Sequence, residues 1–141
     1  MVVTRELEFK TAGNTEMHDI TAEVAGLVQE SGLAAGIVTV FVPGATGALT
    51  TIEYEDGALS DFQRLFDEIA AQDREYHHNM RWGDGNGHSH VRAALLGSDI
   101  TVPFVSGRLT LGTWQQIIFV DFDNRSRRRK LVVQIMGEHD A

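Results

Sequence analysis

Cysteine is absent from this chain of 141 residues. Its absence excludes a disulfide framework, a thiolate zinc site and a cysteine nucleophile, so any metal would need His, Asp, Glu or Asn ligands. Proline is almost absent, with only Pro43 and Pro103, and no Ser/Gly-rich tract interrupts the sequence. We therefore find no linker or repeat and expect one domain over residues 1–141.

Positive charge is also scarce, with 12 basic against 20 acidic side chains and a formal net charge of −8. Such a surface repels nucleic acid and anionic membranes over most of its area. The first ten residues lack the apolar segment of a signal peptide, and no apolar run has the length of a membrane span. We expect a cytoplasmic protein that has neither nucleic acid nor a membrane as its partner.

Hydrophobic periodicity predicts the secondary structure. Apolar and charged side chains alternate in the first ten residues, which is typical of a strand with one face in water. Apolar residues recur at helical spacing over 19–30 and 59–69, and a short helix is expected over 87–96, with Asn86 as its N-cap and Gly97 just past its end. Further strands are expected at 36–42, 48–54, 100–104, 108–111, 116–122 and 130–136.

These elements do not alternate strictly as βαβ units, so they favour an α+β fold, with a largely antiparallel or mixed sheet and about three helices packed on it. The run 36–42 is apolar on both faces and predicts a central strand covered on both sides. After the turn at Pro43–Gly44, the strand 48–54 is expected to pair back on it. Asp123–Asn124 is the turn signal between the last two strands.

Histidine is concentrated in one place, because four of the six histidines lie between His77 and His90. The segment 76–87 has little periodicity and predicts a loop, and its glycines allow tight turns around a bound group. Neutral imidazoles with a carboxylate such as Asp84 or Glu53 suit zinc or a similar divalent ion. The alternative is that these imidazoles cap helix ends and bond backbone carbonyls around the loop.

A basic run, Arg125–Lys130, holds five of the twelve positive charges. In an extended segment Arg125, Arg127 and Arg129 would share one face, a spacing that suits bidentate contacts to phosphate oxygens. The alternative is a solvated arm that pairs with acids on a neighbouring subunit. Both interpretations stay open at this point.

Several motifs together resemble one known family. They are His18-Asp19-Ile20-Thr21, Gly36–Pro43, Thr50–Glu55, Asn86-Gly87-His88-Ser89-His90, Leu95-Leu96-Gly97 and Leu111-Gly112-Thr113-Trp114-Gln115. In this order they are similar to the secondary thiamine-phosphate synthase family, also called YjbQ-like. The resemblance implies an α+β protomer in a homotrimer, with a polar and metal-containing pocket at the subunit boundary. It also implies a weak activity that joins hydroxymethylpyrimidine diphosphate to a thiazole phosphate and releases pyrophosphate.

The residue patterns and the resemblance together give candidates for individual roles; the resemblance carries Glu53, His78, His90 and Asn86, and the spacing of the basic run carries Arg125 and Arg127. The catalytic candidates are Glu53, His78 and His90. The substrate-binding candidates are Thr46, Asn86, Gln115, Arg125 and Arg127. The metal candidates are His78, His88 and His90, with zinc or magnesium as the ion. Many members have His-Thr-Thr where this chain has Gly44-Ala45-Thr46, and His88 could stand in for the missing histidine.

Two classes of function follow. The first is a transferase that acts on a small phosphorylated molecule, in which arginines or a metal neutralise the leaving pyrophosphate and Glu53 or a histidine handles a proton. The second is a non-catalytic trimer that binds a metal, an anion or a small metabolite.

Overall fold

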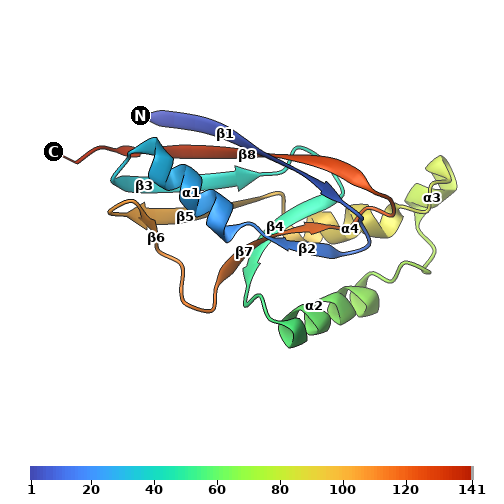
Figure 1. The fold of residues 1–141 in the computed structure, drawn as a ribbon. Coiled ribbons are helices and arrows are strands. Elements are labelled where there is room, and N and C mark those ends of the chain that lie inside the picture. The colour runs from blue at the N-terminus through green and yellow to red at the C-terminus, as the bar shows by residue number, and fades with distance from the viewer. Residues whose placement is uncertain (141) are drawn as a thin grey trace.

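Two antiparallel sheets and four helices make up residues 1–140, which are the residues that this computed structural model describes (Figure 1). The larger sheet has the order β1 (Val2–Thr11), β8 (Arg127–Glu138), β3 (Ala35–Phe41), β5 (Asp99–Val105), β6 (Arg108–Leu109). The smaller sheet has the order β2 (Glu16–Asp19), β7 (Gln116–Asp121), β4 (Gly47–Ile52). The helices are α1 (Thr21–Ser31), α2 (Asp56–Ile69), α3 (His77–Trp82) and α4 (Gly87–Leu96). The antiparallel pairing confirms the predicted α+β class.

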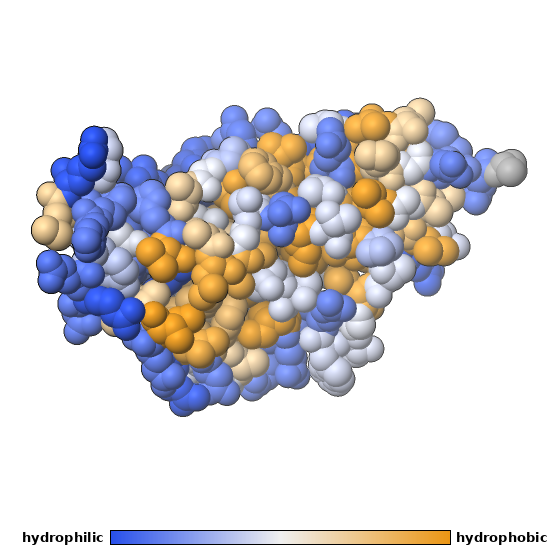
Figure 2. All heavy atoms as spheres, turned by 180° about the vertical axis from the view of Figure 1, so that it is seen from behind, coloured by the Kyte–Doolittle hydropathy of each residue, from blue (hydrophilic) through white to orange (hydrophobic). Residues whose placement is uncertain are grey.

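The five-stranded sheet is covered on one face only. Val38 and Val40 of β3 point into the core, where α1 and the smaller sheet bury them completely or nearly so. Ile37 and Phe41 point to the other face and remain 40% and 42% exposed. Figure 2 shows apolar side chains gathered on the side of the molecule opposite the viewer of Figure 1. The prediction that 36–42 is covered on both sides is therefore wrong for the protomer.

The strand that is covered on both faces is β7 in the smaller sheet. Its residues 117–121 are all buried, because the larger sheet lies on one side of it and α2 and α4 lie on the other. β4 pairs with β7 rather than with β3, so the expected pairing of 48–54 with 36–42 is wrong. The turn at Asp123–Asn124 likewise joins the two sheets instead of closing a hairpin. We call residues 121–129 the corner.

The helix predicted at 87–96 forms as α4, with Asn86 at its start and Gly97 after its end. Gly87 is required there, because a Cβ at this position would lie 2.6 Å from the Cβ of Tyr76. Residues 77–82, expected as a loop, form the short helix α3, which ends at Gly83 in the left-handed conformation. Within residues 1–140, no helix combines the length and apolarity that crossing a bilayer requires.

Candidate functional site

The corner contains two buried carboxylates. Asp121, the last residue of β7, accepts two hydrogen bonds from Arg129, from Nε to Oδ2 at 2.7 Å and from Nη2 to Oδ1 at 2.8 Å. Thr11 of β1 donates a third hydrogen bond to Asp121, at 2.6 Å. Both side chains of this bidentate ion pair are buried. Because Arg129 lies in β8 and Asp121 in β7, the pair links these two strands.

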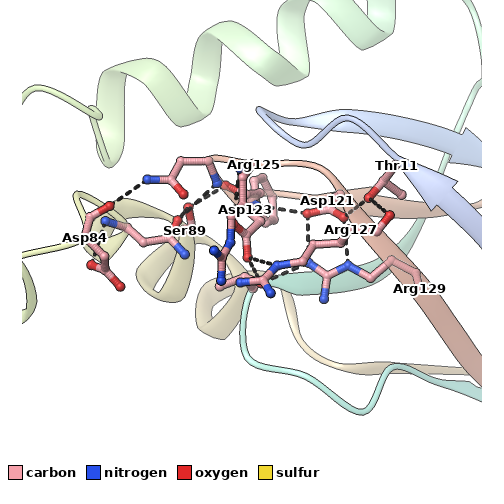
Figure 3. A network of polar contacts seen from close by, with 12 residues as sticks. Thr11, Asp84, Ser89, Asp121, Asp123, Arg125, Arg127 and Arg129 are labelled. Atoms are coloured by element: carbon pink, nitrogen blue, oxygen red, sulfur yellow. Dashed lines mark hydrogen bonds and ion pairs between the residues drawn. The ribbon is translucent and has the colours of Figure 1, made fainter. Parts of the chain in front are cut away.

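Asp123 accepts hydrogen bonds from three directions (Figure 3): Thr46 Oγ1 at 2.9 Å, Arg127 Nε at 3.0 Å and the backbone N–H of Arg125 at 3.2 Å. Burial by itself raises the pKa of this carboxyl. The hydrogen bonds from Thr46 and Arg127, together with the charge of Arg127, outweigh burial and hold the pKa of Asp123 below its usual value. Asp123 is therefore an anion that fixes the direction of Arg127.

The arginines of the corner keep donors that the chain does not use. Arg127 bonds Asp123 through Nε, and within residues 1–140 its two Nη nitrogens have no partner. The guanidinium of Arg125 is exposed and has no partner among these residues either. Arg129 Nη1 likewise has no hydrogen-bond partner in the described part of the chain and lies beside Gly44, where an added Cβ would be 3.2 Å from it. These donors are available to an anion.

Hydrogen bonds attach the start of α4 to the corner. Ser89 Oγ donates to Asn86 Oδ1 at 2.5 Å and also contacts the carbonyl of Phe122. Asn124 N–H donates to the same Asn86 oxygen at 3.2 Å. The side chains of Asn86 and Thr46 thus form hydrogen bonds within the chain. Their direct contact with a substrate stays a prediction.

His78 and His90 lie together beside the corner, with ring centroids 4.5 Å apart. The Nδ1 atom of His78 is 3.4 Å from Asp84 Oδ1. Burial, followed by the nearby charge of His78, lowers the pKa of His90, and this lowering outweighs the opposite effect of Asp84. His90 is therefore neutral at pH 7 and can accept a proton.

His88 points away from this pair. Because α4 begins at Gly87, residues 88 and 90 are both helical and their side chains diverge by roughly 200°. His88 is 2% exposed, its Nδ1 has no hydrogen-bond partner within residues 1–140, and burial followed by the charge of Arg92 lowers its pKa. The expectation that His78, His88 and His90 converge does not hold in the protomer.

A metal site does not fit the described residues. Over residues 1–140, no group of three His, Asp or Glu side chains is placed to hold an ion. His78 and His90 could supply two nitrogen ligands, but His88 cannot supply a third. Zinc or magnesium therefore stays a prediction from the histidine cluster and the resemblance, and we derive no chemical step from it.

Glu53 and Gln115 lie at the opposite end of the smaller sheet. Thr46 precedes β4 and Glu53 follows it, so at about 3.3 Å per residue they are roughly 20 Å apart. Gln115 donates to Thr51 Oγ1 at 3.2 Å near this far end. Within one chain, the predicted site is thus divided between two ends. We call residues 53 and 112–115 the far end.

Two hollows open beside the corner. A basic hollow of about 520 Å³ is lined by Lys10, Thr11, Ala12, Ser126, Arg127 and Arg128. A small-residue hollow of about 380 Å³ is lined by Gly44, Ala45, Gly47, His90, Ala93, Ala94, Gly97 and Ser98. The corner can therefore hold an anion on one side and an uncharged group on the other.

Sequence reasoning missed the residues that build the corner. Asp121 lay inside the predicted strand 116–122, Asp123 was noted only as a turn signal, and Ser89 was noted only as a member of the motif at 86–90. A signal was present, because Asp121 interrupts an otherwise apolar run only a few residues before the arginines. Buried acids need partners, and the nearest basic residues in the sequence were the obvious candidates.

Comparison with known proteins places this two-sheet α+β protein and its polar corner in a family. The family model described as UPF0047 protein YjbQ-like matches residues 5–138. This chain belongs to that family, which confirms the resemblance found in the sequence.

Similar proteins occur in archaea and bacteria. A UPF0047 protein of Methanothermobacter thermautotrophicus is 39% identical over 137 residues, which are 97% of this chain and 94% of the relative. A solved structure from Sulfolobus solfataricus, described as a YbjQ-like protein of unknown function, has a TM-score of 0.88 and 31% identity, covering 98% of this chain and 100% of that one. A YjbQ/UPF0047 structure from Clostridium acetobutylicum has a TM-score of 0.86 and 34% identity, covering 94% and 99%.

Proposed function

We propose that the corner binds the phosphate groups of a small phosphorylated molecule and promotes the departure of pyrophosphate. The observation that carries this proposal is the pair of arginines, Arg125 and Arg127, whose outer guanidinium nitrogens have no partner within residues 1–140 while Asp123 fixes Arg127 in place. Fixed guanidinium groups suit phosphate oxygens because they donate two parallel hydrogen bonds.

The charges of the corner support an anion rather than a cation. Asp121 and Asp123 each have an arginine as their ion-pair partner, so both carboxylates are already satisfied. Arg125 adds a positive charge that has no such partner within residues 1–140, and Lys10 and Arg128, the latter paired with Glu8, line the basic hollow. A diphosphate would therefore meet outer nitrogens of Arg127 that Asp123 already holds in place, with further positive charge nearby.

The resemblance supplies the finer reaction, the synthesis of thiamine phosphate. In it, the bond between the pyrimidine methylene carbon and the diphosphate oxygen breaks, and pyrophosphate leaves with the electron pair. The thiazole nitrogen then supplies the pair for the new carbon–nitrogen bond. Arg125 and Arg127 would neutralise the charge on the leaving group, and neutral His90 would accept a proton or a hydrogen bond from the ring amine.

A homotrimer with this site at the subunit boundary belongs to the same proposal. The uncovered face of the five-stranded sheet supports an assembly, because Ile37, Phe41, Val105 and Met136 are each at least 40% exposed there. Contiguous apolar surface of this kind is typical of protein contacts. A cyclic trimer would give each subunit two neighbours.

The second candidate is non-catalytic binding of the same class of anion, and its support is that Thr46 and Asn86 serve the structure rather than an open site. The discriminating measurement is pyrophosphate release from the two thiamine precursors. We expect release by the wild type that falls at least tenfold in His90→Ala and is unchanged in His139→Ala, an exposed histidine near the C-terminus. Binding of pyrophosphate without any release would leave only the second candidate.

A further inference from the structure

The turn that joins β1 to β2 has an unusual backbone (Figure 1). Gly13, Asn14 and Thr15 all lie in the left-handed region, with φ of +82°, +56° and +68°. Glycine and asparagine adopt this region readily, whereas a β-branched residue such as Thr15 is strained in it. Strain of this kind persists only where surrounding contacts hold the backbone, and it clusters at functional sites.

Hydrogen bonds join this turn to the corner. Asn14 N–H donates to the carbonyl oxygen of Asp123 at 2.7 Å. Thr15 N–H donates to the carbonyl oxygen of Asp121 at 2.8 Å. These are the two acids whose side chains hold arginines of the corner, so the turn fixes the backbone on which that arrangement is built.

Gly13 lies against the same backbone and leaves no room for a side chain. A Cβ added there would lie 2.8 Å from the carbonyl oxygen of Arg125 and closer still to that of Asp123. Both are backbone atoms, so a side chain at position 13 would push the corner away from the turn. The carboxylate of Asp123 fixes the direction of Arg127, and a displaced Asp123 would therefore turn the outer nitrogens of Arg127.

Thr15 connects the turn to two helices. Its side chain is buried, and its Oγ1 accepts a hydrogen bond at 3.0 Å from Nη1 of Arg92, a buried residue of α4. Arg92 Nε also donates to the carbonyl of Ala70, just after α2, at 2.9 Å. Its Nη2 donates to Asp67 Oδ1 in α2 at 3.2 Å. The turn is thus held against the corner by a guanidinium that joins α2 and α4.

We infer that the turn 13–15 sets the geometry of the corner: Gly13 and Thr15 are positioning residues that hold Asp123, and through it the outer nitrogens of Arg127, where they can meet a phosphate. The inference rests on the proposed function, because it concerns that same site. Gly13 and Thr15 act through Asp123 and do not touch the ligand. Their effect can still be large, because a misplacement of about 1 Å in a positioned group can cost about a hundredfold.

Two glycines with the same backbone conformation separate this role from simple strain. Gly13→Ala and Gly32→Ala both place a side chain at positive φ, +82° and +74°, but no atom of residues 1–140 lies within 4 Å of an added Cβ at Gly32. Calorimetric titration should show pyrophosphate binding about tenfold or more weaker in Gly13→Ala and unchanged in Gly32→Ala. Carboxyl NMR titration should show the pKa of Asp123 raised towards its ordinary value in Gly13→Ala alone, because the contact with Arg127 is loosened there.

The side chain of Thr15 gives a second comparison, which decides the question if Gly13→Ala does not fold. Thr15→Gly relieves the backbone strain but removes the acceptor of Arg92, whereas Thr15→Ser keeps that acceptor. We expect pyrophosphate binding about tenfold weaker in Thr15→Gly and close to that of the wild type in Thr15→Ser. A residue needed only for stability would instead give folded Thr15→Gly protein of wild-type affinity.

Wild-type affinity in folded Gly13→Ala or in folded Thr15→Gly would overturn the inference. If the wild type does not bind pyrophosphate, the proposed function is wrong, and the pKa of Asp123 alone decides the positioning role. A pKa that is the same in the wild type and in the folded variants then overturns the inference as well. A raised pKa in these variants leaves the turn as the element that positions Asp123.

Discussion

Asp121 and Asp123 determine where Arg129 and Arg127 point. Both carboxylates are fully buried, and each accepts at least three hydrogen bonds from the chain. The hydrogen bonds to a buried carboxylate fix the orientation of the donor side chains as well as that of the carboxylate. The outer nitrogens of Arg127 are therefore held ready before any ligand arrives.

Replacing Asp123 tests this arrangement at the level of one residue. We expect Asp123→Asn to lower the free energy of unfolding by about 2 kcal/mol at pH 7, as for the loss of hydrogen bonds to a charged group, because Asp123 is buried while the Arg127 side chain is 39% exposed. The folded pKa of Asp123 lies below its ordinary value. Its stabilising effect is thus complete above the unfolded pKa, near 4, and is lost as the pH falls through the lower folded pKa.

Urea unfolding of both proteins between pH 8 and pH 3.5 checks the sign. The difference in unfolding free energy should be constant from pH 8 to about 5 and should shrink below about pH 4. A difference that grows on acidification, or that is absent at pH 7, would contradict the role given to Asp123.

At this scale the sequence revealed which residues are unusual but not how they pair. The concentration of histidines and of arginines marked both segments as unusual, but it did not predict that His78 and His90 would lie beside the arginine run. His88 does not join His78 and His90 because α4 begins at Gly87 as predicted, and side chains two residues apart in a helix point in nearly opposite directions. The burial of Arg129 on Asp121 depends on a contact between two sheets, which no local pattern encodes.

Among the elements, β3 and β8 approach each other unusually closely at one point. A Cβ on Gly36 would lie 2.0 Å from the Met136 carbonyl oxygen and 2.6 Å from Gly137 Cα. Both are backbone atoms that cannot move without breaking the ladder. Gly26 in α1 has no atom within 4 Å of its added Cβ, so it offers a matched control.

We expect Gly36→Ala to lower the free energy of unfolding by about 2 kcal/mol or more through overpacking. Gly26→Ala should raise it by about 0.5–1 kcal/mol, because alanine favours a helix interior. Thermal and urea denaturation measure both changes. Equal effects of the two substitutions would show that the close approach of the two strands does not limit stability.

Elements with strong periodicity could be predicted from the sequence, and their pairing could not. The strands 36–42 and 116–122 and the helices 59–69 and 87–96 lie where their patterns indicated. The error was to treat 36–42 as the strand covered on both sides. A strand whose two faces are both buried inside one protomer has a continuous apolar sequence. A strand with one face buried inside the protomer and the other against a second chain would have the same apolar sequence, so the sequence does not distinguish them.

For the whole molecule, the central question is how a chain with a net charge of −8 would attract the anion that we propose. The arginine run concentrates positive charge in one corner, while the rest of the surface is acidic. Hydrogen-bond donors within a partly desolvated site can outweigh the repulsion from distant acidic side chains. Salt at 0.1 M largely screens the interaction between exposed charges that are more than about 10 Å apart. The expected anion site is therefore confined to the corner.

Calorimetric titration of pyrophosphate tests this claim most directly, using the wild type, Arg125→Ala, Arg127→Ala and the control Arg64→Ala. Loss of either corner arginine should weaken binding by about 1.5–3 kcal/mol, the range for hydrogen bonds to charged groups, and Arg64→Ala should not change it. Arg125→Ala keeps the test valid if Arg127→Ala disturbs folding, because the Arg125 guanidinium has no partner within residues 1–140. If the four proteins bind pyrophosphate with equal affinity, or if none binds it, the corner is not a phosphate site.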